Sequence, residues 1–381
     1  MKILVAPNAF KGSLNAYEVA EKIAEGLQMV DPEIEPILCP IADGGEGTVE
    51  IFVETGGGTY HTCEVSNAIG EPVEARYGIL ADRRTAVLEL AEASGLGQLP
   101  PSKLAPMKAS TFGTGQLMLD ALDKGCKRII LGLGGSATTD GGTGILKALG
   151  IKFLNESGYQ VPPGGGGLGF LDNIDISGLD PRIATCEIIL PCDVSNPLLG
   201  EKGCSTVFSP QKGATKEQMN LLEENLSHFA QLTKQKLGKE IGDMPFGGAA
   251  GGTSAGLSAF LDAKLIGGID FMLHQIGFES KLREAQYLIT AEGRLDSQSL
   301  DGKGPYGVAR RAKVRNVPAF CITGQLPEDF DPKQFDVFQS IFPIPTRPMS
   351  LETAMAQGGE LVRFAAWQIG SMLKVAQNLL N

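Results

Sequence analysis

The sequence has no uninterrupted apolar run of about 18 residues, the length that a membrane-spanning helix requires. The apolar run at residues 3–6 is too short for a signal peptide. The seven cysteines are scattered and form no C-x-x-C pair, so neither a disulfide framework nor a zinc site is indicated. We therefore expect a soluble protein of the reduced cytoplasm.

Basic residues are also in short supply. The chain has 33 Lys and Arg residues against 44 Asp and Glu residues, which gives a formal net charge of −11. Nucleic acids and anionic membranes both require a basic surface, so we expect neither as a partner. An anionic substrate would need a local pocket of positive charge.

Glycine, in contrast, is abundant, with 50 residues in a chain of 381, nearly twice the usual share of about 7%. The glycines cluster in loops, which suggests backbone that lies close to a ligand or adopts positive φ. A chain of this length exceeds what one hydrophobic core usually supports, so two domains are expected.

Short apolar runs alternate with amphipathic segments at both ends of the chain, which is typical of a parallel α/β sheet. Residues 60–92 instead predict antiparallel strands, because no helix fits between the short runs. We predict an α/β fold in which residues 1–58 and 282–381 form a doubly wound, Rossmann-like parallel sheet domain. Residues 59–281 form an inserted mixed α/β domain. The cleft between the two domains is the expected active site.

The segment 288–303 is the most informative part of the sequence, because a buried-type strand leads into charges of both signs. Ligands of open α/β sheets bind beyond the carboxyl ends of the strands, where Glu292 stands. Asp296 could accept the proton of a substrate hydroxyl, while Arg294 and Lys303 neutralise phosphate oxygens. A charged surface loop is the alternative.

Two further loops follow predicted strands near the N-terminus. Lys11 and Ser13 precede a helix N-terminus, where free amides and the helix dipole favour an anion. Asp43 and Glu46 stand among glycines, which suits a hard cation or the orientation of hydroxyl groups. Each has a simple alternative: a turn with a solvated lysine, and a glycine turn whose carboxylates cap the next helix.

The Gly-rich loop at residues 132–142 weakly matches the G-x-G-x-x-A dinucleotide fingerprint. A nicotinamide-dependent oxidoreductase acting on a hydroxy acid is therefore one alternative function. The polar side chains of Ser136, Thr138, Thr139 and Asp140 suit a nucleotide phosphate or a polyhydroxylated acid better.

Asp193 and Asn196 occupy another strand-end loop. An Asp/Asn pair is a recurring way to hold a phosphate-bound magnesium ion, although an Asx-turn is the common alternative. The three histidines are far apart, and both the G-x-S-x-G elbow and the Walker pattern are absent. The sequence therefore disfavours a serine hydrolase and a zinc enzyme. A kinase with this sequence would bind the ATP phosphates through a loop other than the Walker loop.

Seven motifs, in this order and spacing, resemble the bacterial type 1 glycerate kinase family. They are APNAFKGS (6–13), ADGGEGT (42–48), GGSATTDGG (134–142), DVSNPL (193–198), PQKGA (210–214), GAAGG (248–252) and EGRLD (292–296) with Gly302-Lys303. The resemblance covers the chain from the first strand to the last helix. It implies transfer of the γ-phosphoryl group of ATP to D-glycerate, with 2-phosphoglycerate as the expected product and Mg²⁺ as a required ion.

Within this resemblance, the chemistry of the side chains assigns the roles. Asp296, Lys11 and Arg294 are the expected catalytic residues, and Asp193 and Asp43 are the expected metal ligands. The expected substrate and nucleotide contacts are Ser13, Asp43, Glu46, Ser136, Thr138, Thr139, Asp140, Asn196, Gly251, Glu292 and Lys303. A non-catalytic sugar-acid binding protein is the second alternative function. Which Gly-rich loop takes the nucleotide, and whether the chain forms a homo-oligomer, stay open.

Overall fold

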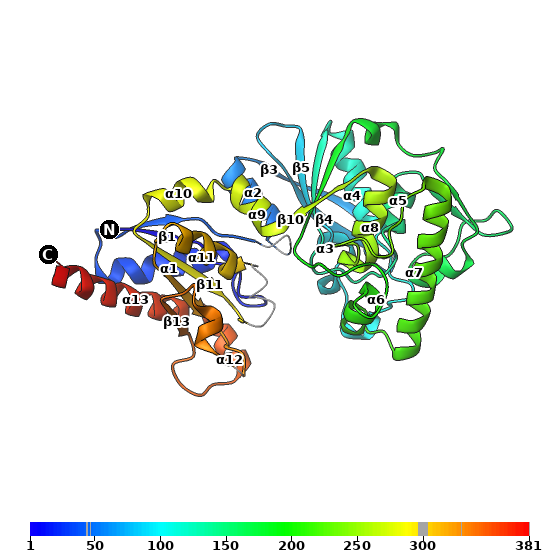
Figure 1. The fold of residues 1–381 in the computed structure, drawn as a ribbon. Coiled ribbons are helices and arrows are strands. Elements are labelled where there is room, and N and C mark those ends of the chain that lie inside the picture. The colour runs from blue at the N-terminus through cyan, green and yellow to red at the C-terminus, as the bar shows by residue number, and fades with distance from the viewer. Residues whose placement is uncertain (43–44, 46, 296–303, 329, 381) are drawn as a thin grey trace. The chain divides into compact units, whose positions relative to one another are not determined.

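The computed structural model describes residues 1–42, 45, 47–295, 304–328 and 330–380. The chain folds as two compact units, drawn in Figure 1. Unit 1 comprises Met1–Asp43 and Ile269–Asn381, and unit 2 comprises Gly44–Gly268. The first boundary precedes α2 (Thr48–Gly56), so this helix belongs to unit 2, whereas the sequence placed it in the first domain.

Unit 1 is built on a five-stranded sheet in the order β13-β12-β11-β1-β2, and every neighbouring pair is parallel. The strands are β1 (Lys2–Val5), β2 (Glu35–Leu38), β11 (Tyr287–Glu292), β12 (Ala319–Thr323) and β13 (Ser340–Pro343). Parallel strands place their carboxyl ends on the same edge. The segments after β1 and β11, which are neighbours in the sheet, therefore start side by side.

Helices cover both faces of this sheet and bury most of its three central strands, β1, β11 and β12. Helix α1 (Ala16–Val30) begins at a capping box between Asn15 and Glu18 and packs with α13 (Gly358–Leu380) over the face that carries Ile3. Leu4 points to the opposite face and is also buried, because α10 (Phe278–Glu284) and α11 (Gly304–Val314) pack on the central strands.

The apolar periodicity of the C-terminal segment predicts a single long helix from Ser350, but the structure differs. The segment forms two helices, α12 (Leu351–Ala356) and α13, with the break at Gln357. The Ser13 hydroxyl donates a hydrogen bond of 2.6 Å to the Met355 carbonyl at the end of α12. A Cβ on Gly358 would lie only 2.6 Å from the same hydroxyl oxygen. A contact from the N-terminal loop therefore accompanies the break, which coincides with two consecutive glycines, Gly358 and Gly359.

Unit 2 contains a six-stranded mixed sheet in the order β10-β9-β6-β5-β4-β3. Its strands are β3 (Thr59–Ser66), β4 (Pro72–Ile79), β5 (Thr85–Glu89), β6 (Arg128–Gly132), β9 (Glu187–Cys192) and β10 (Lys264–Gly267). The antiparallel strands predicted between residues 60 and 92 are confirmed as β3, β4 and β5. From β5 to β10 the pairing is parallel. A separate hairpin pairs β7 (Lys152–Leu154) with β8 (Asn173–Asp175).

The helices of unit 2 pack around a core that contains a group of three phenylalanine rings, Phe153, Phe229 and Phe260. Besides α2, the helices are α3 (Ala91–Ser94), α4 (Phe112–Asp123), α5 (Thr143–Ala148), α6 (Cys204–Phe208), α7 (Lys216–Leu237) and α8 (Ala249–Leu261). Helix α8 contains left-handed backbone at residues 250–252 and is therefore kinked in its first turn. Helix α9 (Gly268–Gln275) begins where the chain returns to unit 1.

All seven cysteines are free thiols, and only Cys63 is partly exposed. In the part of the chain that the structure describes, no helix is long and apolar enough to span a membrane.

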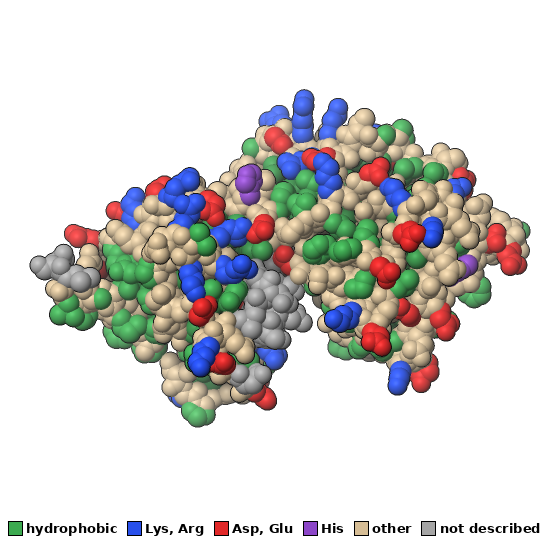
Figure 2. Space-filling model, viewed as in Figure 1, with side chains coloured by type: hydrophobic (Ala, Val, Ile, Leu, Met, Phe, Trp, Pro, Cys, Tyr) green, Lys and Arg blue, Asp and Glu red, His purple; other side chains and the backbone are tan. Residues whose placement is uncertain are grey.

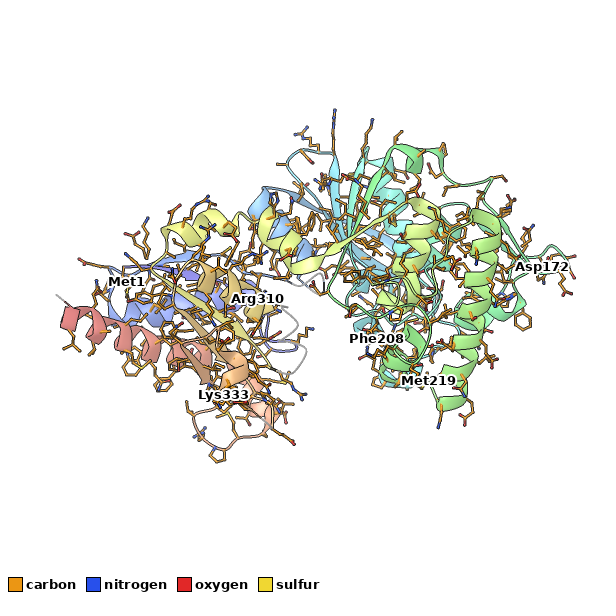
Figure 3. All side chains as sticks on the ribbon, in the orientation of Figure 1. Met1, Asp172, Phe208, Met219, Arg310 and Lys333 are labelled. Atoms are coloured by element: carbon orange, nitrogen blue, oxygen red, sulfur yellow. The ribbon has the colours of Figure 1, made fainter. Side chains whose placement is uncertain are left out.

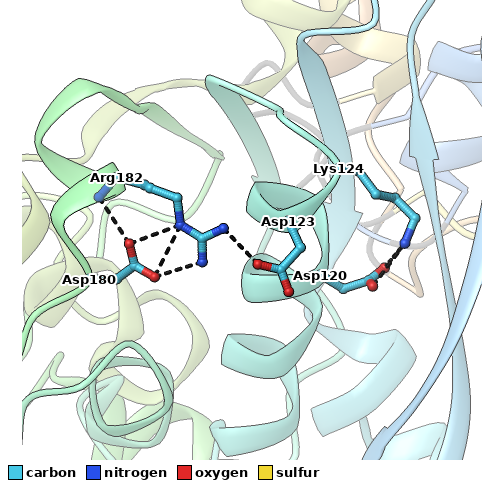
Figure 4. A network of polar contacts seen from close by, with 5 residues as sticks. All are labelled: Asp120, Asp123, Lys124, Asp180 and Arg182. Carbon is cyan, nitrogen blue, oxygen red and sulfur yellow. Dashed lines mark hydrogen bonds and ion pairs between the residues drawn. The ribbon is translucent and has the colours of Figure 1, made fainter.

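An ion network on the surface of unit 2 ties α4 to the turn that starts at Asp180 (Figure 4). Arg182 bonds the Asp180 carboxylate and reaches Asp123 at 2.6 Å, while Lys124 bonds Asp120 at 2.8 Å. The Arg182 guanidinium holds the pKa of the Asp180 carboxyl below its ordinary value. Exposed ion pairs of this kind stabilise a fold by about 1 kcal/mol at most.

Candidate functional site

The carboxyl ends of β1 and β11 bring two predicted motifs of unit 1 into contact. The backbone N–H of Asn8 donates a hydrogen bond of 2.8 Å to the Ala291 carbonyl, which extends the pairing of β1 with β11. Beyond it, a Cβ on Gly293 would lie 3.4 Å from Phe10 Cα and 3.7 Å from the Lys11 amide nitrogen. The loop that carries Lys11 and the segment that begins at Glu292 therefore pack directly against each other.

Asn8 and Glu292 also meet at the start of α11. A Cβ on Gly304 would lie 3.3 Å from Asn8 Nδ2 and 3.8 Å from Glu292 Oε1, and Gly304 has a φ of +41°. The first residue of α11 thus sits beside a buried amide and a half-buried carboxylate. Asn8 was missed as a site residue, although it stands in the first quoted motif.

Among the predicted cations that the structure describes, Lys11 and Arg294 are exposed to solvent. Ser13, predicted as a ligand contact, donates its hydroxyl to the Met355 carbonyl. Four other predicted residues lie outside the described residues, namely Asp43, Glu46, Asp296 and Lys303.

Unit 2 brings the two Gly-rich loops, 134–142 and 247–252, together. The Gly141 N–H donates to the Gly251 carbonyl at 3.0 Å. Gly251 has a φ of +65°, and a Cβ there would collide with the Thr138 carbonyl oxygen. Only glycine fits here, since the close approach leaves no room for a Cβ atom and the left-handed backbone disfavours a side chain.

The strand-end loop with Asp193 and Asn196 joins the same group. The Gly248 N–H donates to the Asn196 carbonyl at 2.9 Å, and the Asn196 side-chain amide donates to the Lys202 carbonyl at 2.8 Å. Asp193 is half-buried, and its Oδ1 accepts from the Gly268 N–H at 2.9 Å. Three predicted loops, which follow β6, β9 and helix α7, therefore converge within unit 2.

Asp140 is enclosed by its own loop. Its carboxylate is fully buried and accepts hydrogen bonds from the Thr111 N–H and hydroxyl, both at 2.9 Å, and from the N–H groups of Gly142 and Gly144. Burial raises the pKa of the Asp140 carboxyl, and these donors oppose that shift in part. These hydrogen bonds hold the conformation of the 134–142 loop and tie it to Thr111.

The three hydroxyl side chains of the loop are buried as well. Thr139 Oγ1 lies 3.2 Å from Ser209 Oγ, and Ser136 Oγ accepts a bond of 2.9 Å from Lys212 Nζ. Thr138 Oγ1 has no hydrogen-bond partner among the described residues. Lys212 was missed, because a lysine between Gln211 and Gly213 gives no local sign of burial.

Glu89 is the second buried charged residue that the sequence did not reveal. It ends β5, pairs in register with Gly132 at the end of β6, and accepts a bond of 2.8 Å from the Val49 N–H of α2. It therefore lies where the 134–142 loop begins and where the chain leaves the 42–48 motif.

A groove of about 890 Å³ on unit 1 is lined by arginines of α10, α11 and the residue that follows α11. On the face in Figure 2, basic side chains gather over α10 and α11, and Figure 3 labels Arg310 on α11. Arg311 pairs with Asp270 at 2.5 Å and with Glu279 at 3.2 Å, which neutralises part of the charge. None of the predicted site residues lines this groove.

Comparison with known proteins decides the family. A model described as "Glycerate kinase family" matches residues 3–374. The chain belongs to the glycerate kinase family. It is 46% identical to a glycerate kinase of Halalkalibacterium halodurans, over 96% of this chain and 97% of that protein. It is 41% identical to the glycerate 2-kinase of Escherichia coli K12, over 98% of each.

The fold agrees with this family assignment. The crystal structure of a candidate glycerate kinase 2 from Salmonella typhimurium LT2 matches with a TM-score of 0.86 at 42% identity, over 99% of both chains. The predicted α/β class and the family resemblance are thus confirmed. The type 1 subtype and the doubly wound arrangement with an inserted domain stay predictions.

The donor set of this glycerate kinase family member is compatible with magnesium. No group of three or more His, Cys, Asp or Glu residues able to hold a metal occurs within the described ranges. Mg²⁺ needs fewer, since it is usually held by one or two carboxylates together with phosphate oxygens and water. The half-buried carboxylate of Asp193, held at a strand end, fits that requirement.

Proposed function

We propose that the protein is a glycerate kinase that transfers the γ-phosphoryl group of ATP to D-glycerate. The observation that carries the proposal is the full-length similarity to proteins named glycerate kinase. The relative from E. coli is named glycerate 2-kinase, which supports 2-phosphoglycerate as the product. The two groups of strand-end loops give the chain the cations, hydroxyls and close backbone that a phosphoryl-transfer site needs.

In this proposal, the substrate hydroxyl oxygen attacks the γ-phosphorus, and the bond from that phosphorus to the bridging oxygen of ADP breaks. Asp296 accepts the hydroxyl proton. Lys11 and Arg294, together with Lys303, stabilise the phosphoryl oxygens or the glycerate carboxylate. The exposure of Lys11 and Arg294 supports this role, because both side chains are accessible to an anion.

Magnesium is the proposed metal, with Asp193 and Asp43 as the residues that would hold it. The ion would neutralise phosphate charge. Asn196 assists from the same loop, because its carbonyl bond to Gly248 links that loop to the second Gly-rich loop.

The Gly-rich loops of unit 2 form the remaining contacts in the proposal. Their glycines allow the backbone around Gly251 and Thr138 to approach closely, as it must around a nucleotide phosphate or a small hydroxy acid. Glu292 and the hydroxyls of the first loop are proposed as hydroxyl-orienting groups. The cytoplasm, where ATP is available, is the proposed location, and an active site shared by both units stays a prediction.

A coupled assay of ADP release with Mg-ATP tests the function. We expect turnover with D-glycerate, a much slower reaction with L-glycerate and neighbouring hydroxy acids, and 2-phosphoglycerate as the product in a phosphorus NMR spectrum. Thermal stabilisation by Mg-ATP accompanies this result. Stabilisation by NAD with hydride transfer would instead establish the oxidoreductase, and stabilisation by D-glycerate without ADP release would establish a binding protein.

A further inference from the structure

Lys212 is a fully enclosed lysine in the short turn Pro210–Lys212 between α6 and α7. Its side chain is only 2% exposed. Nζ donates one hydrogen bond of 2.9 Å to Ser136 Oγ and another of 2.5 Å to the Thr138 carbonyl. Both acceptors belong to the Gly-rich loop 134–142, which is more than 70 residues away in the sequence.

The surroundings of this amino group do not compensate its charge well. The ionisable groups that face it are Cys204 of α6 and Asp140 of the loop. Burial raises the pKa of the Cys204 thiol to about 12, so it is neutral at physiological pH. The Asp140 carboxylate is already occupied by Thr111 and two backbone N–H groups. Burial consequently lowers the pKa of Lys212 to about 8.

A lysine in this position is a poor choice for stability alone. Removing an ammonium group from water costs several kcal/mol, and an apolar side chain of similar volume often packs as well or better. Methionine would fill the space without the charge. The cost of Lys212 therefore needs a reason other than packing.

The two acceptors of Lys212 supply that reason. The Thr138 carbonyl that accepts from Nζ is the group against which Gly251 packs, so Lys212 bonds the point where the two Gly-rich loops touch. Ser136 forms a bridge with Gly95, and the Ala137 N–H donates to the Ser94 carbonyl at 2.9 Å. The loop is thus held by strand-like pairing on one side and by Lys212 on the other.

We infer that Lys212 is a positioning residue for phosphoryl transfer, which holds Ser136 and the Thr138 carbonyl so that both Gly-rich loops keep the shape that receives the ligands. The inference rests on the proposed function. It assigns a role to the PQKGA motif, whose lysine contacts the predicted binding loop 134–142.

The test compares Lys212→Met with Thr233→Val as a matched control. Thr233 is also fully buried in unit 2, and its hydroxyl donates only to the Phe229 carbonyl of its own helix at 2.8 Å. We expect both variants to melt within a few degrees of each other. Lys212→Met loses about 100-fold or more in kcat/KM, as misplacement of binding groups does, whereas Thr233→Val keeps near wild-type activity.

Hydrogen–deuterium exchange without ligand supplies a readout that is independent of activity. In Lys212→Met, the amides of residues 135–142 exchange at least several-fold faster, while those of β6 and α7 are unchanged. A Lys212→Met enzyme with near wild-type turnover and unchanged exchange overturns the inference. Faster exchange throughout unit 2 also overturns it, since that result shows a general structural role.

Lys212→Arg keeps the test decisive if the methionine variant does not fold. In the wild type, kcat/KM should fall as the pH rises through about 8, where Lys212 loses its proton. This fall should disappear in Lys212→Arg, because arginine keeps its charge at all these pH values. An identical fall in Lys212→Arg contradicts the inference. A wild type that releases no ADP with D-glycerate refutes the proposed function instead, and the exchange experiment then still tests the positioning of the loop.

Discussion

Glu89 Oε1 accepts a hydrogen bond of 2.8 Å from the backbone N–H of Val49, so the end of β5 holds the first turn of α2. Glu89 is only 6% exposed. The first N–H groups of a helix lack partners within the helix and carry partial positive charge, which a carboxylate complements. Because α2 begins at Thr48, the last residue of the 42–48 motif, this bond holds the end of that motif against β5.

Replacing Glu89 should therefore lower the free energy of unfolding, by an amount that depends on whether the new side chain can still accept the hydrogen bond. We expect Glu89→Ala to lower the free energy of unfolding by about 1–3 kcal/mol, because the Val49 N–H loses its acceptor in a buried position. Glu89→Gln keeps a side-chain oxygen and should lose less. Urea denaturation followed by circular dichroism measures both, and equal losses would contradict the role of the oxygen.

Gly251 offers a test of close backbone approach with a matched control. Gly251→Ala must adopt a φ of +65° and also collides with the Thr138 carbonyl, whereas Gly238→Ala faces a φ of +69° with nothing within 4 Å. Gly238→Ala should lose about 1 kcal/mol of stability. Gly251→Ala should lose considerably more, and its activity should fall below detection. Similar melting temperatures for the two variants would show that the loops can separate freely.

Asp140 should prove to be a stability residue. Removal of its carboxylate leaves the Thr111 and Gly142 donors buried without an acceptor, so we expect Asp140→Ala to lose about 3 kcal/mol or more. Asp140→Asn, which can accept with one oxygen only, should fall between this variant and the wild type. Chemical denaturation checks the order. The contact role predicted for Asp140 stays a prediction, and a fully stable Asp140→Ala protein that binds ligand poorly would support it.

Lys212 predicts an unusual dependence of stability on pH. Because its folded pKa of about 8 lies below the ordinary value of 10.5, the unfolded chain binds more protons between these values, and stability gains with rising pH. The gain approaches roughly 1.4 kcal/mol per pH unit for one proton. The difference in unfolding free energy between wild type and Lys212→Met, measured from pH 7 to 10, should therefore shift in favour of the wild type. A constant difference would show that Lys212 titrates normally.

Asp296 tests the chemistry of the proposed reaction. Asp296→Asn removes the proton acceptor while keeping the size of the side chain, so kcat should fall by orders of magnitude with an unchanged melting temperature. The ADP-release assay measures this effect. Near-normal turnover would remove Asp296 from the mechanism.

The sequence predicted best where the signal is local. The Asn15–Glu18 capping pattern and the apolar periodicity that follows it predict a helix over residues 16–30, and the structure has α1 (Ala16–Val30) there. Strand β10 was not predicted, since its four residues form a strand only through pairing with β9. The break before Gly358 was missed as well, where the Met355 carbonyl accepts a hydrogen bond from Ser13 at the other end of the chain.

The residues of the candidate site also differ in how far the sequence could predict them. Strand-end polar residues such as Lys11 and Asn196 could be proposed, because strand ends and glycine loops leave a pattern in the sequence. The enclosure of Asp140 and Lys212 could not, because burial of a charge depends on elements that are distant in the chain. Because lysine and aspartate are almost never fully buried, solvent or a ligand was the expected partner of both side chains.

The reactivity of the free cysteine thiols reports local unfolding, because a buried thiol reacts only after the structure around it opens. Cys39 and Cys321 are sealed inside unit 1, and Cys126, Cys186, Cys192 and Cys204 are sealed inside unit 2, while Cys63 is partly accessible. A thiol reagent added during gentle heating should therefore modify Cys63 first. Peptide mass spectrometry then reveals, from the order in which the other sulfurs react, which half of the protein loosens before its neighbour.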